Sequence, residues 1–287
     1  MTGRFRAATA AVVLVATGAL AGCGGGFSSA PPSPPSNAVR TYVALGDEFT
    51  AAPGSADATD DSGCQRSASN YPALLGKALH VTHVKDVSCT GATTGSLTSD
   101  QRPTKGKPAV PPQFDALAKD TDLVTMGIGI EDHDLVRHVL QICLALPCGD
   151  NVPPQTIIGD VSTMATALTA AVRVVQDRAP DSYIVLVGYP TIVPDTGTCR
   201  DLPKLTQDAR DAANRVLDEI NRDIASAARE TGAGFLDVAQ LSRGHELCSR
   251  DPWIEATRAD DGSFAYRPAA AEQRAVAEAL ASLVRNR

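Results

Sequence analysis

The stretch that decides the fold is TYVALGDEFT at residues 41–50, an apolar run that ends in Gly46 and is followed by two acids. Such a run is typical of a strand buried on both faces of a sheet. Four more strands are predicted at 84–89, 122–129, 183–188 and 234–238, and helices at 71–79, 157–179, 205–231 and 269–284. This alternation predicts an α/β fold with about five parallel strands and helices on both faces.

The composition is that of an ordinary globular protein. The chain has 287 residues, of which 43% are hydrophobic and 21% are charged, so disorder, collagen and coiled coil are excluded as the main organisation. The formal net charge of −7 argues against non-specific binding of nucleic acid, which needs a basic face. We therefore expect one folded domain, as a monomer, with no nucleic-acid partner.

The N-terminus predicts export. Arg4 and Arg6 precede an uncharged apolar run that ends at Leu20, which is too short to be a membrane span and is typical of a secretory signal. The sequence LAGC at 20–23 resembles a bacterial lipobox, so residues 1–22 are expected to be a lipoprotein signal peptide. Cys23 would then carry lipid and hold the protein on the outer face of the bacterial cell membrane. A plain secretory signal with an incidental cysteine is the alternative.

Residues 24–36 are Gly, Ser and Pro apart from Phe27 and Ala30, a composition that cannot form a core. We predict a tether over 23–39 and one domain over 40–287. Six cysteines remain beyond Cys23, and an even number in an exported domain predicts three disulfides, although fifteen pairings are possible. Zinc is the alternative, but no spacing is C-x-x-C. The six are Cys64, Cys89, Cys143, Cys148, Cys199 and Cys248.

Polar and glycine-rich segments follow the predicted strands. They read GDEFT at 46–50, SCTGATT at 88–94 and GIGIED at 127–132, and FAYRP at 264–268 precedes the last helix. In a parallel sheet the working groups lie just past the carboxyl ends of the strands, so these segments are where chemistry is expected.

Taken in order, the four segments resemble the sequence blocks of the SGNH (GDSL) hydrolases, a family of esterases and lipases, over essentially all of residues 40–287. The flanking motifs NYP at 70–72, GYP at 188–190 and GHELC at 244–248 also match. The resemblance implies a three-layer, flavodoxin-like fold. It also implies the disulfide pairs of the secreted three-disulfide branch, namely Cys64 with Cys89, Cys143 with Cys148, and Cys199 with Cys248.

The same resemblance places altered residues at three catalytic positions. Glu48 stands where the family has its nucleophilic serine, Glu131 where it has an oxyanion-binding asparagine, and Arg267 where it has the catalytic histidine; Gly91 matches the oxyanion-hole glycine. Glu48 has no hydroxyl to activate, and Arg267 cannot accept a proton as a general base. An ionised Glu131 would repel an oxyanion, and loss of one oxyanion donor alone slows such enzymes by about 10²–10³.

These substitutions predict that the esterase machinery is degenerate and that the protein binds a ligand or partner without turnover; drift without a selected role stays open. We expect Glu48 and Arg267 to form an ion pair, and Glu131 to leave the cleft acidic enough to favour a cationic ligand. The alternative is an active esterase or lipase with a non-standard arrangement, in which His133 is the histidine nearest the site. No cofactor is expected.

A metal site formed by residues 131–134 with Glu48 is the remaining alternative. The spacing of these residues fits no standard zinc or calcium loop, so no metal is predicted. Trp253, the single tryptophan, is interpreted as a packing residue that the family resemblance places near the cleft.

Overall fold

The computed structural model describes residues 38–54, 62–103, 106–134, 154–199, 202, 205–256 and 266–287. The predictions for the signal peptide, for lipidation of Cys23 and for most of the tether therefore lie outside the described residues. Within the described residues, no helix combines the length and the apolar character that crossing a membrane would need.

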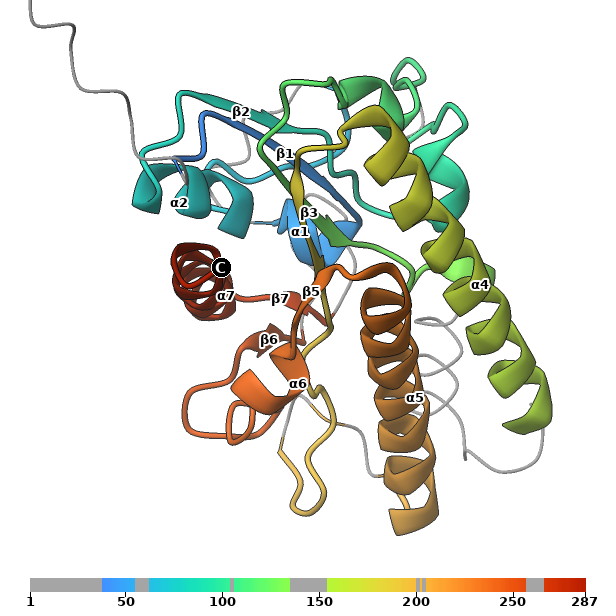
Figure 1. Ribbon diagram of the computed structural model, residues 1–287. Coiled ribbons are helices and arrows are strands. Elements are labelled where there is room, and N and C mark those ends of the chain that lie inside the picture. Colours follow the sequence, from blue (N-terminus) through green and yellow to red (C-terminus); the bar gives the residue numbers. More distant parts are fainter. Residues whose placement is uncertain are drawn as a thin grey trace, which may run out of the picture. The chain divides into compact units, whose positions relative to one another are not determined.

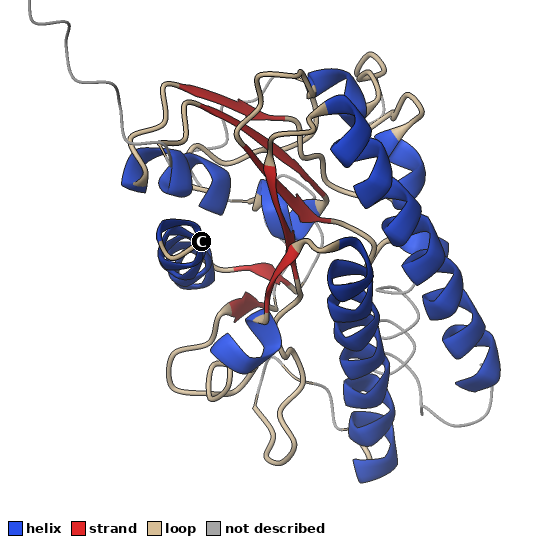
Figure 2. Ribbon diagram, in the orientation of Figure 1, coloured by secondary structure: helices blue, strands red, loops and turns tan. Residues whose placement is uncertain are grey.

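The centre of the domain is a five-stranded parallel sheet with the order β2-β1-β3-β4-β5 (Figures 1 and 2). Its strands are β1 (Thr41–Gly46), β2 (His83–Asp86), β3 (Leu123–Gly127), β4 (Tyr183–Val187) and β5 (Gly234–Leu236). All five begin at or within one residue of the predicted start, and the last four end one to three residues earlier than expected. The predicted α/β class with about five parallel strands is confirmed.

Helices cover both faces of the sheet, as the alternating pattern predicts (Figure 2). On one face α4 (Pro154–Arg178) packs beside α5 (Gln207–Thr231), and on the other α2 (Tyr71–Ala78) packs beside α7 (Ala270–Arg285). Successive residues of one strand serve the two layers: Val43 and Leu45 lie in the core with α4 and α5, whereas Tyr42 and Ala44 lie in the core with α2 and α7. This is the two-sided burial expected of a continuous apolar strand.

Helix ends follow the capping residues in the sequence. The side chain of Asn70 accepts from the backbone N–H of Ala73 at the start of α2, and the side chain of Thr206 does the same for Ala209 at the start of α5. At the other end of α5, Gly232 takes the left-handed conformation with φ 75°, which a side chain would disfavour. The cap at Asn70 confirms the predicted beginning of α2.

Several short elements were not predicted because a four-residue segment has no measurable periodicity. They are α1 (Glu48–Ala51), α6 (Val238–Leu241), the antiparallel pair β6 (Ile254–Glu255) and β7 (Arg267–Pro268), and three 3₁₀ turns at Thr94–Leu97, Gln113–Ala116 and Asp132–Asp134. Of these elements, α1 and the 3₁₀ turns at Thr94–Leu97 and Asp132–Asp134 follow the carboxyl ends of β1, β2 and β3, so they shape the candidate site.

Two of the expected disulfides are present. Cys64 is bonded to Cys89 and Cys199 to Cys248, as the family resemblance implies. The expected Cys143–Cys148 pair lies outside the described residues. The Cys64–Cys89 bond fastens the segment after β2 to the chain that leads into α2, which holds the neighbourhood of Gly91 in place.

Candidate functional site

The carboxyl edge of the sheet brings together three of the four predicted positions. Glu48 begins α1 directly after β1, Gly91 follows β2, and Glu131 follows β3. β1 and β3 pair in register up to Gly46 and Gly127, so the segments that leave them start side by side. The fourth position, Arg267, lies in β7, which packs against α1. The sequence blocks therefore converge as the resemblance implies.

A network of buried side chains fixes the turn that presents Glu48. Asp47 caps α1 by accepting from the backbone N–H of Phe49 at 3.0 Å, and its other oxygen accepts from the Tyr189 hydroxyl at 2.6 Å. Gln113 makes two bonds with the backbone of Gly46, at 2.8 and 3.0 Å. Gly46 is required here, because a Cβ would lie 2.1 Å from Oγ1 of Thr50.

Glu48 is the central group of the site. Its side chain is only 4% exposed, and its Oε2 accepts the backbone N–H of Gly91 at 3.3 Å. Burial raises the pKa of Glu48 well above its ordinary value, and the carboxyls of Glu131 and Asp47 raise it further. The Glu131 carboxyl is thus close enough to Glu48 to disfavour its charged form.

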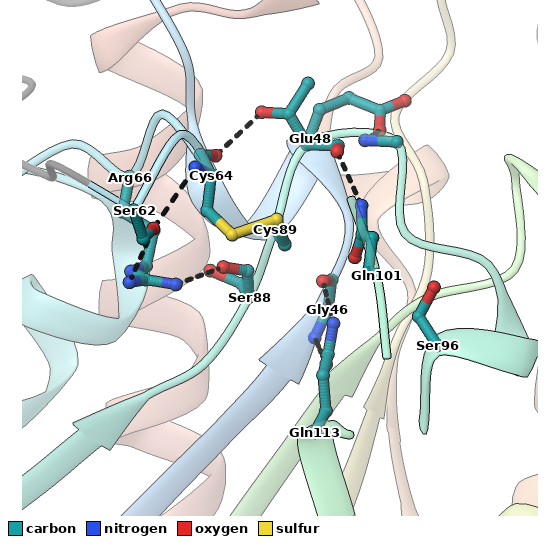
Figure 3. The surroundings of a disulfide bond; sticks show 12 residues. Gly46, Glu48, Ser62, Cys64, Arg66, Ser88, Cys89, Ser96, Gln101 and Gln113 are labelled. Carbon is teal, nitrogen blue, oxygen red and sulfur yellow. Dashed lines mark hydrogen bonds between the residues drawn. A yellow bond between two sulfur atoms is a disulfide. The ribbon is translucent and has the colours of Figure 1, made fainter. Parts of the chain in front are cut away.

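Gly91 donates to Glu48 from a braced loop. Thr90, the residue before it, bonds the carbonyl of Cys64 through both its N–H and its hydroxyl, at 3.1 and 3.0 Å. The amide of Gln101 donates to the Thr90 carbonyl at 2.9 Å. Figure 3 shows Glu48, Gln101 and the Cys64–Cys89 disulfide in one neighbourhood. The main-chain donor that the resemblance assigns to an oxyanion hole thus donates to the Glu48 carboxyl in this chain.

The segment after β3 is tied to the segment after β2. Asp132 accepts from the N–H and the hydroxyl of Thr94, at 2.7 and 2.5 Å. Burial raises the pKa of Asp132, and the two bonds from Thr94 oppose that rise. His133 takes φ 53°, and its Nδ1 lies 3.9 Å from Oδ1 of Asp160 on α4. The side chain of His133 is exposed, and its acidic neighbour is Asp160 of α4. Among the contacts of the described residues, none joins His133 to Glu48.

Arg267 does not make the ion pair that we expected. Its guanidinium donates to Oε2 of Glu255 at 2.5 Å, across the β6–β7 pair, and is 6% exposed. It also packs on the backbone after α1, where a Cβ on Gly54 would lie 2.5 Å from Nε of Arg267. Among the ion pairs of the described residues, none joins Arg267 to Glu48, so this prediction was wrong. The opposite charges that replace serine and histidine are satisfied by separate partners.

Metal binding finds no support at this edge. Within the described ranges, no group of three His, Cys, Asp or Glu side chains has the spacing of a metal site. A cavity of about 350 Å³ lies elsewhere, beside α5 and α6, and none of the four predicted positions lines it. Its lining includes Asp218, Arg222, Asp237 and Arg243.

Three positioning residues were missed by the sequence argument. Gln113 holds Gly46, Tyr189 holds Asp47, and Gln273 joins α7 to α1 by donating to the Phe49 carbonyl at 2.9 Å. Tyr189 lies in the GYP motif, which was noted without a role for its side chain, and Gln273 lies in the last predicted helix. Gln113 begins the 3₁₀ turn at Gln113–Ala116, which was not predicted. Trp253 is 7% exposed and stacks on His245, as expected of a packing residue.

The chain belongs to the GDSL-like lipase/acylhydrolase family, whose model matches residues 44–281. Curated relatives include a lipase of Streptomyces rimosus, 31% identical over 88% of each chain. Lipase 2 of Streptomyces coelicolor is 31% identical over 95% of each chain. An esterase of Streptomyces scabiei is 30% identical over 85% of this chain and 81% of its own.

Solved structures agree with the fold. The extracellular lipase of Streptomyces rimosus superposes with a TM-score of 0.70 and 29% identity, over 85% of this chain and 99% of that one. The phospholipase A1 of Streptomyces albidoflavus gives a TM-score of 0.68 and 28% identity over the same shares. The expected SGNH-type, three-layer fold is thereby confirmed. The relatives carry the names of active hydrolases, and one is called extracellular, which is consistent with export of this chain.

Proposed function

We propose that this protein is an exported member of the GDSL-like family that binds a ligand with the site described above and does not hydrolyse esters by serine chemistry. The observation that carries the proposal is the bond from the Gly91 N–H to a buried Glu48 carboxyl. That carboxyl stands where the family resemblance places a serine hydroxyl, and it already occupies the oxyanion donor. An ester carbonyl would have to displace it before any attack.

The side chains that could act as a general base or a nucleophile at the site also support binding without turnover. Arg267 cannot act as a general base and is held by Glu255. Glu48 is itself a poor nucleophile, because its raised pKa disfavours the ionised carboxylate and because attack on an ester would produce an anhydride. The neighbouring Glu131 disfavours an anionic ligand, while the raised pKa of Glu48 weakens the preference for a cation that we first expected. A neutral polar ligand is equally compatible with the site.

We further propose that Cys23 carries lipid and holds the domain at the outer face of the bacterial membrane. The support is the LAGC sequence at 20–23, the apolar run before it and the Gly/Ser/Pro tether after it. The test is the mass of the N-terminal peptide of the protein extracted from membranes, with Cys23→Ala as the control. A peptide that begins at residue 23 without added lipid would contradict the anchor.

Ester hydrolysis is the second candidate, and the relatives favour it, since the curated ones quoted above are named lipases or esterases. A hydroxyl that contacts a buried acid at this edge is that of Thr94, which donates to the Asp132 carboxylate at 2.5 Å. Asp132 has a raised pKa, so it is a stronger base than an ordinary aspartate. This arrangement would be a non-standard one.

Hydrolysis of p-nitrophenyl acetate and of a longer-chain ester by the purified protein separates the two candidates. We expect no turnover above a heat-treated sample. Turnover that is lost in Glu48→Ala, His133→Ala or Thr94→Val, but kept in the distant Thr166→Val variant, would overturn the binding proposal and identify the reacting group. Thr166 is a matched control, because its hydroxyl only bonds the Ser162 carbonyl within α4.

A further inference from the structure

The amino edge of the sheet, opposite to the candidate site, carries a group of basic side chains that the proposed function does not use. We call this surface the basic edge and define it by Arg40, Lys77, His80, His83, Lys85 and Arg285, all of them exposed. They come from the residue before β1, the last turn of α2, the turn after it, the edge strand β2 and the end of α7. Residues 62–85 contain no acid, in a chain with a net charge of −7.

Hydrogen bonds hold these segments together. The backbone N–H of His83 donates to the Arg40 carbonyl at 2.8 Å, and β2 pairs with β1 from that point. The guanidinium of Arg285 donates to the Ala78 carbonyl at 2.8 Å, at the end of α2. Figure 1 shows the C-terminus beside α2. The basic edge is therefore formed by neighbouring segments around β2, with Val84 on the face of the strand that packs on Gly76 of α2 and Lys85 on the opposite face.

One carboxylate lies at this edge, that of Asp122, which accepts from the backbone N–H groups of Arg40 and Thr41 at 2.8 Å each. Among the described residues, no carboxylate forms an ion pair with Arg40, Lys77, Lys85 or Arg285. The surface also contains Val84, which is 42% exposed and is the one large hydrophobic side chain of the described residues that is exposed to this degree. Cations around an exposed apolar side chain are a combination that suits the headgroup region of an anionic membrane.

The position at which the described chain begins also favours a membrane as the partner of the basic edge. The described part begins at Ala38, two residues before Arg40, and fourteen residues separate Ala38 from Cys23. A Gly/Ser/Pro segment of this length reaches at most about 50 Å when extended and about 20 Å on average as a flexible chain. A lipid on Cys23 would therefore keep the basic edge within a short distance of the bilayer.

We propose that the basic edge docks the domain onto anionic phospholipid headgroups, with the candidate site facing away from the membrane. This proposal rests on the proposed lipid anchor, which holds the domain near the surface, while the basic edge sets its orientation. Each basic side chain close to an anionic surface strengthens attachment about fivefold, and the effect weakens as salt shortens the screening length.

The test uses the lipidated protein reconstituted into vesicles of phosphatidylcholine alone or with one third phosphatidylglycerol. Lysines are modified with a limiting amine-reactive reagent and quantified by mass spectrometry. Docking predicts that Lys77 and Lys85 react at least about fivefold more slowly on the anionic vesicles, and that high salt removes the difference. Lys107 is the internal reference, because it lies beside Gly63 at the other end of the sheet.

Two charge variants sharpen the test without removing the reporter lysines. Arg40→Glu with Arg285→Glu should abolish the protection of Lys77 and Lys85. Arg215→Glu with Arg229→Glu changes the net charge equally on exposed positions of α5 and should leave the protection intact. Equal reactivity on both kinds of vesicle, with the protein still membrane-bound, would overturn docking and leave the anchor standing.

Other outcomes are equally decisive. Protein found in solution with no lipid on Cys23 would defeat the anchor itself. Protection that occurs on phosphatidylcholine alone and grows with the protein-to-lipid ratio would mean that two copies pair through the edge strand β2, and would overturn the lipid proposal.

Discussion

The buried acids at the carboxyl edge fall into two groups that differ in what faces them. Asp47 and Asp132 each accept two hydrogen bonds from neutral donors, a tyrosine or threonine hydroxyl and a backbone N–H in both cases. Glu48 has the Gly91 N–H on one side and the carboxyl of Glu131 on the other. We call Asp47 and Asp132 with their donors the frame of the site, and Glu48 with Glu131 its centre. The acids of the frame have hydrogen-bond donors, whereas the centre places two acids against each other.

The difference indicates which part of the family architecture this chain has kept. A carboxylate with two donors stabilises the turn that it bridges, while a buried acid next to another acid must hold a proton or incur a desolvation cost. The frame therefore supports the fold, and the centre carries the change in chemistry. Substitutions in the two regions should have opposite effects on the free energy of unfolding.

The largest expected effect comes from placing the family's catalytic residues at the altered positions while the frame is left unchanged. Glu48→Ser, Glu131→Asn and Arg267→His together should give hydrolysis of p-nitrophenyl acetate at least about 100-fold above the unchanged protein, because a nucleophile, an oxyanion donor and a base return at once. The same protein with Glu48→Ala in place of Glu48→Ser is the matched control. A folded triple variant without activity would show that the frame has also changed.

Much of this frame could be predicted from the sequence, because apolar runs and capping residues act locally. The strands at 41–46 and 183–187 and the cap at Asn70 follow from such patterns. The convergence of Glu48, Gly91 and Glu131 followed from the rule that parallel strands end at one edge. The partner of Arg267 could not be found this way, since Glu255 reaches it through a two-residue antiparallel pair that has no periodicity.

Glu272, a buried acid outside the candidate site, tests whether burial of a carboxyl lowers stability as we expect at the centre. Glu272, in the first turn of α7, is 2% exposed and accepts from the Gln273 amide at 2.6 Å, and burial raises its pKa to about 8. Because the folded-state pKa lies above the unfolded one, the contribution of Glu272 to stability is complete below about pH 4.3 and is lost as the pH rises towards 8. The loss attributable to Glu272 should be about 3–5 kcal/mol.

Glu272→Gln should remove that loss and so raise the free energy of unfolding at pH 8, with little change at pH 4. Urea unfolding of both proteins across this range measures the difference. Glu278→Gln, at an exposed position of the same helix, is the control for a change in net charge. An equal effect of the two substitutions at pH 8 would mean that burial of Glu272 is not the cause.

The frame itself should respond in the opposite direction. Asp47→Ala removes the cap of α1 and leaves the Tyr189 hydroxyl and the Phe49 N–H without their acceptor, which should lower the free energy of unfolding by about 2–4 kcal/mol. Glu131→Ala, at the half-buried centre, should change it by less than about 1 kcal/mol. Equal destabilisation by the two variants, measured by urea unfolding, would remove the distinction between frame and centre.

The smallest expected effect belongs to Glu48→Gln, which keeps the shape of the side chain and removes its proton exchange. Since burial and the Glu131 carboxyl raise the pKa of Glu48, its contribution to stability is complete below the unfolded pKa and is lost as the pH rises through the folded one. The variant should match the unchanged protein at pH 4 and exceed it in free energy of unfolding at pH 8, which urea unfolding of both proteins measures. Because the amide oxygen of the substituted side chain can still accept the Gly91 N–H, a loss of stability at pH 8 would contradict the raised pKa of Glu48.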